Sequence, residues 1–524
     1  MFTLMAASSA SSSYPMIWRA ATNSHRRGVR QTRCPSSLSC SHSSPISCIN
    51  GASLPQRAKL DLNPSHSLRH LSTSSQRHHP SPTSSHSASS PSSSRRPPPA
   101  PSKLASGHLP NKPGSAFLSD LDDCFFDQMR VWKDKAGNEL TEIPTFRLLD
   151  GKGRAVSKEA EARVEELSKE EALQIYRYMM LLPQLDQVLY SAQRQGRISF
   201  WMTSYGEEAA VIGTAAALSS VDEVYSQYRE LGLLLYRGLP LDQLLAQVFG
   251  THMDKGKARQ MPTHIGSSEH HFHTISSPLS TQIPQAAGSA YALKRTPGRE
   301  GDVVACWFGE GASSEGDFHA GLNIASTLHC PVLWLARNNG FAISTPATEQ
   351  YRGDGIASRG PGYGTLTIRV DGNDVLAVKV AVAEAKKRAL RESRPVLIEL
   401  MTYRIGHHST SDDSGSYRPT SSVEEWSKLD NPLHRFRAHL LSRSWWDSSS
   451  ESSLIASHRK SVLQALSVAE KAPQPDPFET LFEDTWKEKP RVLEEQKREL
   501  RRLVEKYGEG WEPWRKALEK VKKG

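Results

Sequence analysis

The sequence predicts an α/β fold, with a mostly parallel sheet flanked by helices and a helical C-terminal region. Between residues 203 and 400, short apolar segments alternate with helical ones, as a parallel sheet with crossover helices requires. The clearest unit has apolar segments at 303–308 and 331–336 and a helical pattern at 314–328. Because the return between them is short, we expect the two apolar segments to be parallel, neighbouring strands.

A long amphipathic helix precedes the sheet region. Ser168 and Glu171 have the spacing of a capping box at its start, and Gly196 stands where a helix commonly ends. Pro183 lies inside this helix and predicts a kink or a split. Residues 117–149 come before the helix, and we expect them to form an irregular arm that lies on another surface.

The helix predicted at 314–328 begins with a second capping box, formed by Ser314 and Asp317. Its apolar face consists of residues at helical spacing, namely Phe318, Leu322, Ala325 and Leu328. This apolar face should therefore pack against the sheet.

The remaining elements follow in order along the chain. Strands are predicted at 366–370 and 396–400, with a helix at 376–390 between them. Helices dominate from residue 431 onward, and the Ser-rich segment 448–453 is expected to be a mobile turn. We therefore predict four parts: a transit peptide and linker (1–115), an N-terminal arm (116–167), an α/β domain (168–430) and a helical C-terminal region (431–524).

The formal net charge of +9 is unevenly distributed. Residues 1–119 contain thirteen Lys and Arg and one acid, Asp61, so their balance is +12 and the rest carries 9 − 12 = −3. The mildly acidic remainder argues against a nucleic-acid-binding protein. The first hundred or so residues are rich in Ser, Arg, His and Pro, which is typical of a mitochondrial or plastid transit peptide; a plain disordered tail is the alternative.

Cysteine usage and hydropathy restrict the compartment. Of six cysteines, only Cys124, Cys306 and Cys330 lie beyond the N-terminal segment, and none forms a CxxC pair. This pattern indicates a reducing compartment, and Cys306, inside an apolar segment, is expected in the core. The sequence contains no run of about 18 apolar residues, so we predict no membrane span.

Polar side chains follow both strands of the central unit. Glu310 comes after the first strand and Asn339 after the second, so both should lie at the sheet edge where open α/β sheets bind ligands. Their side-chain oxygens, with the carbonyl of Phe341 as a third ligand, suit a hard cation such as Mg2+. For either residue alone, a turn with a capping Asn is the alternative. Three neighbouring histidines match no zinc-ligand spacing, so we expect no metal at them: His270, His271 and His273.

The unit with Gly-Glu-Gly at 309–311 and Asn-Asn-Gly at 338–340 resembles the thiamine-diphosphate motif. Further segments resemble the alpha subunits of branched-chain 2-oxo acid dehydrogenases: residues 227–230, 259–262, 276–284, 351–355 and 404–413. The resemblance extends from about residue 117 to the C-terminus. It implies the thiamine-diphosphate-binding fold for the α/β domain.

The resemblance also implies the reaction and the assembly. The family decarboxylates branched-chain 2-oxo acids oxidatively with thiamine diphosphate and passes the acyl group to a lipoyl group, in branched-chain amino acid catabolism in the mitochondrial matrix. It implies a beta subunit in an alpha2-beta2 heterotetramer, which supplies the carboxylate that activates the cofactor, a lipoylated acyltransferase core and a regulatory kinase. The alternatives are a pyruvate dehydrogenase alpha subunit and a non-catalytic assembly subunit. The Gly-Glu-Gly variant argues against the first, and the intact site residues argue against the second.

Several residues receive roles from the resemblance. Tyr228 and Arg229 follow a short strand and begin a helix, a place that favours anions, and the family binds the pyrophosphate there. A surface Arg paired with Glu230 is the alternative. Arg337 is expected to neutralise phosphate. His408 is expected to be the acid/base residue, since imidazole titrates near physiological pH, and an exposed loop His is the alternative.

The resemblance completes the site as follows. Three further residues are implied to contact the cofactor: Ser277, Leu279 and Gly309. Four are implied to hold a potassium ion, K+: Ser276, Pro278, Thr281 and Gln282. Ser409 is implied to be phosphorylated by the kinase, whereas Pro419 stands where the family has a second phosphorylatable Ser. Phe341 replaces the usual Tyr, which is harmless if only its carbonyl binds Mg2+.

Overall fold

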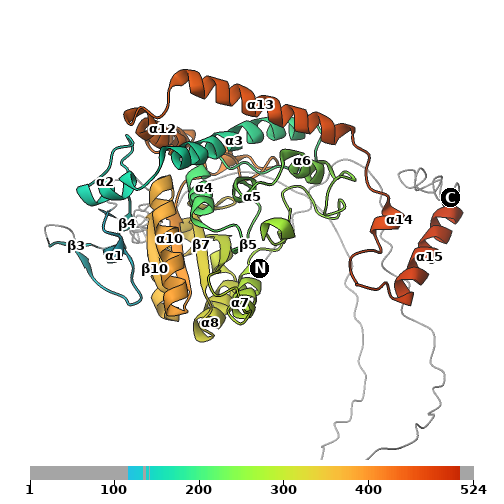
Figure 1. Cartoon of the computed structure of the whole chain (residues 1–524), viewed down its shortest axis with the longest axis horizontal. Helices are drawn as coiled ribbons and strands as arrows, with labels where there is room; N and C mark the ends of the chain where they lie inside the picture. The colour runs from blue at the N-terminus through green and yellow to red at the C-terminus, as the bar shows by residue number, and fades with distance from the viewer. Residues whose placement is uncertain (1–115, 134–136, 141, 508–524) are drawn as a thin grey trace, which may run out of the picture. The chain divides into compact units, whose positions relative to one another are not determined.

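A seven-stranded parallel sheet forms the centre of the protein. The computed structural model describes residues 116–133, 137–140 and 142–507, which belong to one compact unit. The strand order is β1-β4-β10-β11-β7-β6-β5, and every pair is parallel, so the predicted fold class is confirmed (Figure 1). The strands are β1 (Phe117–Leu118), β4 (Thr145–Phe146), β5 (Glu223–Tyr225), β6 (Val304–Gly309), β7 (Val332–Asn338), β10 (Leu366–Asp371) and β11 (Val396–Met401).

Helices cover both faces of this sheet. One face carries α3 (Lys169–Arg194), α4 (Glu208–Ala217), α5 (Leu231–Tyr236) and α10 (Val375–Glu392); the other carries α7 (Gln282–Leu293) and α8 (Gly316–Thr327). Strand β6 shows why both faces need cover, because successive side chains point in opposite directions. Ala305 and Trp307 belong to the first core, while Val304, Cys306 and Phe308 belong to the second, so Cys306 is a core residue as predicted.

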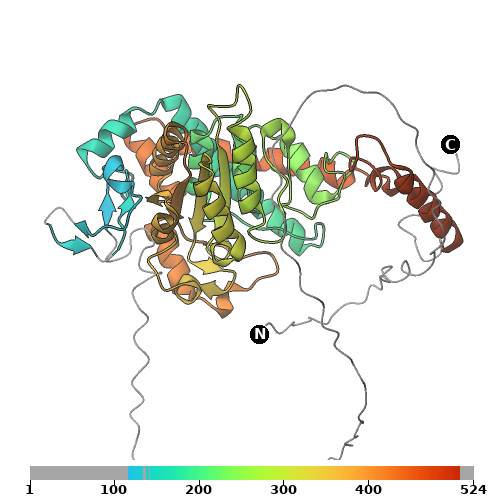
Figure 2. The ribbon, with the colours of Figure 1, turned by 90° about the horizontal axis from the view of Figure 1, so that it is seen from below.

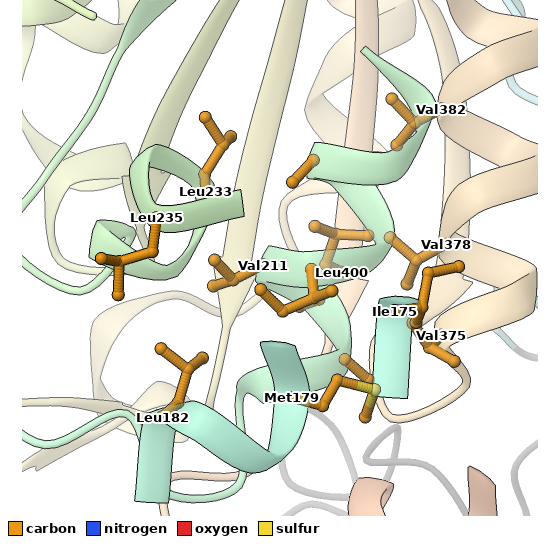
Figure 3. Packing of buried hydrophobic residues seen from close by; sticks show 14 of the residues in the cluster. Ile175, Met179, Leu182, Val211, Leu233, Leu235, Val375, Val378, Val382 and Leu400 are labelled. Atoms are coloured by element: carbon orange, nitrogen blue, oxygen red, sulfur yellow. The ribbon is translucent and has the colours of Figure 1, made fainter. Parts of the chain in front are cut away.

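The larger core joins helices to the sheet and to one another. Figure 3 shows residues of α3, α4, α5 and α10 pointing into a shared apolar layer over Leu400 of β11. The predicted strands at 366–370 and 396–400 and the helix at 376–390 are confirmed. The inward face of α10 is buried as expected from its period.

Helix α3 confirms one local prediction and contradicts another. Ser168 caps it, because its hydroxyl accepts from Glu171 N–H at 3.2 Å, and Gly196 follows its end with φ +73°. The helix continues through Pro183, so a split at this residue is wrong, whereas the kink, the other predicted outcome, stays a prediction. Packing of its apolar face against α4 and α5 compensates for the backbone hydrogen bond that proline removes.

The central strand–helix–strand unit has the predicted topology, with β6 and β7 as parallel neighbours. Its predicted capping box is wrong. Helix α8 begins at Gly316 after Glu315, which makes no side-chain cap, and Ser314 ends a short 3-10 helix instead. Leu328 is exposed rather than buried, because α8 has ended before it.

The N-terminal arm is not wholly irregular. Its strands β1 and β4 extend one edge of the main sheet, and Figure 2 shows this blue segment at one end of the row of strands. The Ser-rich segment at 448–453 is helical, because Asp447 caps α13 (Ser448–Lys471) at its start, so the predicted turn is wrong. Figure 1 shows α13 lying along α3, and the two helices are in contact.

The other elements are short or peripheral. They are α1 (Leu121–Cys124), β2 (Trp132–Lys133), β3 (Glu139–Leu140), α2 (Lys158–Glu165), α6 (Leu241–Phe249), β8 (Phe341–Ala342), β9 (Thr345–Pro346), α9 (Ala347–Gln350), α11 (Thr420–Leu429), α12 (Pro432–Ser442), α14 (Pro477–Thr480) and α15 (Arg491–Tyr507). Among the described residues, no helix is long and apolar enough to span a membrane. The predicted transit peptide and linker, 1–115, lie outside the described residues, and the boundaries predicted at 167 and 430 stay predictions.

Candidate active site

Glu310 and Asn339 lie together at the carboxyl edge of the sheet. Glu310 directly follows β6 and Asn339 directly follows β7, and these strands are paired with Gly309 opposite Arg337. Both side chains are buried. Both also approach the same backbone N–H, that of Phe341, which donates to Asn339 Oδ1 at 3.2 Å and also bonds Glu310. The predicted juxtaposition of a carboxylate and an amide oxygen is thus present.

The carboxylate of Glu310 lies in surroundings that suit an oxygen ligand of a cation. Burial is the main cause that raises its pKa, to about 8; the nearby negative charge of Glu207 also raises it, whereas hydrogen bonds from its own backbone and from Phe341 lower it. Its Oε1 accepts no hydrogen bond from any residue that the structure describes. A buried oxygen of this kind is costly unless a ligand satisfies it, and an adjacent amide oxygen completes a donor set that suits Mg2+.

Glu207 is a site residue that the sequence reasoning missed. It precedes α4 and is 1% exposed. Its Oε1 accepts from Asn339 Nδ2 at 2.8 Å, and its Oε2 lies 2.9 Å from Arg337 Nε. One signal could have revealed it: Glu207 and Glu208 stand at the start of a mostly apolar helix, where acids are seldom buried without a partner.

Arg337 is fully enclosed between two carboxylates. Its guanidinium forms ion pairs with Glu207 and with Glu230, and its side chain is 3% exposed. Its charge is therefore already balanced within the chain. The predicted contact with phosphate stays a prediction, and the structure adds to it a role in linking β7 to the segment after β5.

Arg229 and His408 come together although 179 residues separate them. The Arg229 guanidinium donates to the carbonyl oxygens of Thr203 and His408, and its Nη2 lies 3.3 Å from His408 Nδ1. Arg404 Nη1 lies 3.4 Å from the same nitrogen. Arg229 is buried and Glu230 pairs with Arg337, so the alternative of a surface pair is wrong.

Burial and these two guanidinium groups together keep His408 uncharged. Burial lowers its pKa first, and Arg229 and Arg404 lower it further, to about 3. The pKa of this imidazole thus lies well below physiological pH in the chain alone, and the acid/base role of His408 stays a prediction. Because both arginines present N–H donors to Nδ1, this nitrogen accepts and the proton resides on Nε2. Tyr228 lies beside the ring, edge to face, with centroids 6.0 Å apart.

The loop before α7 presents the other predicted contacts. Ser277, Pro278 and Leu279 are exposed, and Leu279 retains 40% of its accessible surface. The Ser277 hydroxyl lies 2.7 Å from Nε2 of His264, whose Nδ1 is 3.0 Å from the carbonyl of Pro262. His264 is thus a second residue that the sequence reasoning missed. His264 also lines a cavity of about 600 Å³.

The residues implied for K+ lie on the same loop and have partners within the chain. The Thr281 hydroxyl donates to the carbonyl of Pro278 at 3.2 Å, and the buried Gln282 amide donates to the Trp307 carbonyl at 2.9 Å. Ser276 is half-buried.

Two of the three neighbouring histidines contact the carboxylate of Glu223, one at each oxygen: His271 at 3.0 Å and His273 at 3.2 Å.

Ser409 lies on the inner side of a closed loop. It is 8% exposed, and its hydroxyl accepts from Ser411 N–H at 3.2 Å. Asp412 closes the loop by accepting from His408 N–H at 2.7 Å and from the Tyr417 hydroxyl at 2.6 Å. Modification of Ser409 therefore requires this loop to open.

Comparison with known proteins extends the picture beyond this site. A family model described as "Dehydrogenase E1 component" matches residues 176–478. Over 372 residues the chain is 53% identical to the mitochondrial 2-oxoisovalerate dehydrogenase subunit alpha of Homo sapiens, covering 71% of this chain and 82% of that protein. It is 48% identical over 395 residues to the protein of this name from Caenorhabditis elegans, covering 75% and 90%. It is also 48% identical over 371 residues to subunit alpha 1 of Arabidopsis thaliana, covering 71% and 77%.

Proposed function

The chain belongs to the family of 2-oxoisovalerate dehydrogenase alpha subunits, and we propose on this basis that it performs oxidative decarboxylation of branched-chain 2-oxo acids with thiamine diphosphate. The acyl product passes to a lipoyl group, and the reaction belongs to branched-chain amino acid catabolism. The relatives are named mitochondrial, which agrees with the predicted transit peptide, and we place this chain in the mitochondrial matrix. The similarity favours this reading over pyruvate dehydrogenase and over a non-catalytic subunit.

The observation that carries the proposal is the buried pair of Glu310 and Asn339. Within this pair, Glu310 Oε1 has no hydrogen-bond partner among the residues that the structure describes. These residues, with the Phe341 carbonyl, would hold Mg2+, and the cation would hold the diphosphate. Tyr228 and Arg229, which contact His408, would hold the other side of the diphosphate. The remaining proposed contacts are Ser277, Leu279, Gly309, Arg337 and His408 for the cofactor and Ser276, Pro278, Thr281 and Gln282 for K+.

Thiamine diphosphate, held by these residues, would supply the electron sink for the decarboxylation. The contribution of His408 follows from its surroundings. It is neutral at physiological pH and carries its proton on Nε2, since Arg229 and Arg404 both donate toward Nδ1. His408 therefore acts as a hydrogen-bond donor from Nε2, toward the substrate oxygen, and the two arginines keep it from accepting a second proton.

The proposed site is completed by a partner subunit. The exposed Ser277, Pro278 and Leu279 leave one side of the cofactor contact open on this chain. We propose that the beta subunit covers this side in an alpha2-beta2 heterotetramer and supplies the activating carboxylate. The lipoylated acyltransferase core would receive the acyl group. A kinase acting on Ser409 would regulate the activity of this chain.

Calorimetry of the chain co-expressed with its beta subunit tests the proposal. Titration of thiamine diphosphate with Mg2+ should show much weaker binding for Glu310→Ala, because the cation loses a protein ligand. Glu315→Ala is the matched control, since Glu315 is an exposed carboxylate five residues further along the same segment. Wild-type affinity in Glu310→Ala would contradict the proposed site. Release of carbon dioxide from 3-methyl-2-oxobutanoate, compared with pyruvate, tests the substrate class.

A further inference from the structure

The Asn339 amide has two chemically different ends, and only its oxygen can bind a cation. In the structure Nδ2 donates to Glu207 Oε1 at 2.8 Å, while Oδ1 accepts from Phe341 N–H at 3.2 Å. A flip of the amide would place its oxygen against the Glu207 carboxylate and its NH2 against another N–H donor. Both contacts would then be repulsive, so the hydrogen bonds permit one orientation.

Glu207 can impose this orientation because it is itself held in place. Its second oxygen lies 2.9 Å from Arg337 Nε, and Arg337 also pairs with Glu230. Glu230 in turn accepts from the Ser226 hydroxyl and from Gln227 N–H, each at 2.9 Å. The buried series Glu230, Arg337, Glu207 and Asn339 thus links the segment after β5 to the end of β7.

We propose that Glu207 is a positioning residue, which turns the Asn339 oxygen toward the cation and does not itself bind it. This inference rests on the proposed Mg2+ site. Partners behind a metal ligand fix its orientation, and their loss typically weakens metal binding about 10- to 100-fold. Glu207 stands in this relation to Asn339, whereas Glu230 has the same relation to Arg337 without contact to Asn339.

Binding of Mn2+ in the presence of thiamine diphosphate, followed by electron paramagnetic resonance, measures the effect on the co-expressed complex. Glu207→Leu removes the acceptor and should weaken Mn2+ binding at least about 10-fold. Glu207→Gln keeps one acceptor for the two donors Asn339 Nδ2 and Arg337 Nε, and it should weaken Mn2+ binding by only a few-fold, less than Glu207→Leu does. Glu230→Gln is the matched control, because it removes a carboxylate from Arg337 on the other side and should leave Mn2+ binding within the same few-fold range.

A second background separates orientation from general damage to the fold. A carboxylate presents oxygen whichever way it turns, and in Asn339→Asp it would also repel Glu207, so in this background Glu207→Leu should not weaken Mn2+ binding. A loss of equal size in both backgrounds would overturn the inference, as would equal losses in Glu207→Gln and Glu207→Leu. Glu310→Ala separates failure of the metal site from failure of the positioning role. If Glu310→Ala binds Mn2+ like wild type, the proposed metal site is wrong. If Glu310→Ala weakens binding and Glu207→Leu binds Mn2+ like wild type, only the positioning role is wrong.

Discussion

The buried arginine of β10 provides a quantitative test of how the sheet holds the site. Arg369 is 0% exposed; its Nε lies 3.0 Å from Glu399 Oε2 and its Nη1 lies 2.9 Å from Asp354 Oδ1. Glu399 also accepts from the Asn338 amide, next to the proposed metal ligand. Arg369→Met would leave Glu399 buried without its countercharge. Removing one partner of a buried pair costs about 3–5 kcal/mol, which at roughly 2 °C per kcal/mol lowers Tm by roughly 6–10 °C.

The pH dependence of this loss distinguishes charge from packing. Burial opposes ionisation of Glu399, but Arg369 and hydrogen bonds from Ile356, Asn338 and Ala357 outweigh it and lower its pKa below 4.5. In the wild type, this carboxylate therefore adds stability above its unfolded pKa, and the gain is lost as pH falls through the lower folded pKa. In Arg369→Met burial should instead raise the pKa, so protonation at low pH relieves the penalty. The deficit in Tm should be largest near pH 8 and shrink toward pH 5.

Differential scanning fluorimetry of the two proteins at several pH values measures this deficit. The double variant Arg369→Met with Glu399→Gln is the control, because the neutral amide removes the buried charge and its single oxygen still accepts from one of the two N–H donors, Ile356 or Ala357. It should be more stable than the single variant at neutral pH. A deficit in Tm that is constant between pH 5 and pH 8 would refute the electrostatic reasoning and attribute the loss to packing.

Two further substitutions test the backbone and the regulatory loop. Gly206 has φ +91°, and an added Cβ would lie 2.3 Å from the Tyr403 carbonyl, so Gly206→Ala should strongly lower the thermal stability; Gly196→Ala, with φ +73° and open space, should cost only about 1 kcal/mol, and equal losses would contradict this reasoning. Ser409→Glu should abolish lipoyl-dependent turnover with little change in Tm, since a charge in this buried position must open the loop, whereas the exposed Ser411→Glu should retain activity; full turnover of Ser409→Glu, or of fully phosphorylated protein, would count against a switch.

The fold was predictable where a local pattern and the global structure agree. Strands β6, β7 and β11 are mostly apolar and fully buried, so their composition identifies them, whereas β10 is identified by its alternation of apolar and polar residues. Strands β1 and β4 have two residues each, and only pairing with the sheet makes them strands. The Ser-rich start of α13 has turn-like composition, but the Asp447 cap and the packing of this helix on α3 decide its conformation.

The site was predictable as far as topology reaches. Glu310 and Asn339 follow neighbouring parallel strands, and this relation alone brings them together. The partner of Asn339, Glu207, is 132 residues away in the chain and sits on another element, so no spacing indicates the contact. For the same reason the charge of His408 could not be derived from its own segment, because Arg229 lies 179 residues away.

The two asparagines before Gly340 have separate roles, and the geometry of the strand explains why. Successive residues of a strand point to opposite faces, and in β7 the even-numbered apolar side chains belong to the second core while the odd-numbered ones belong to the first. Asn338 accordingly donates to Glu399 at 2.9 Å on the second face, and Asn339 donates to Glu207 at 2.8 Å on the first. Gly340, with φ +87°, then turns the chain so that Phe341 N–H returns toward both Glu310 and Asn339. A buried carboxylate thus fixes each amide. Asn338 joins β7 to β11 through Glu399, whereas Asn339 is held by Glu207 with its oxygen available to the proposed cation.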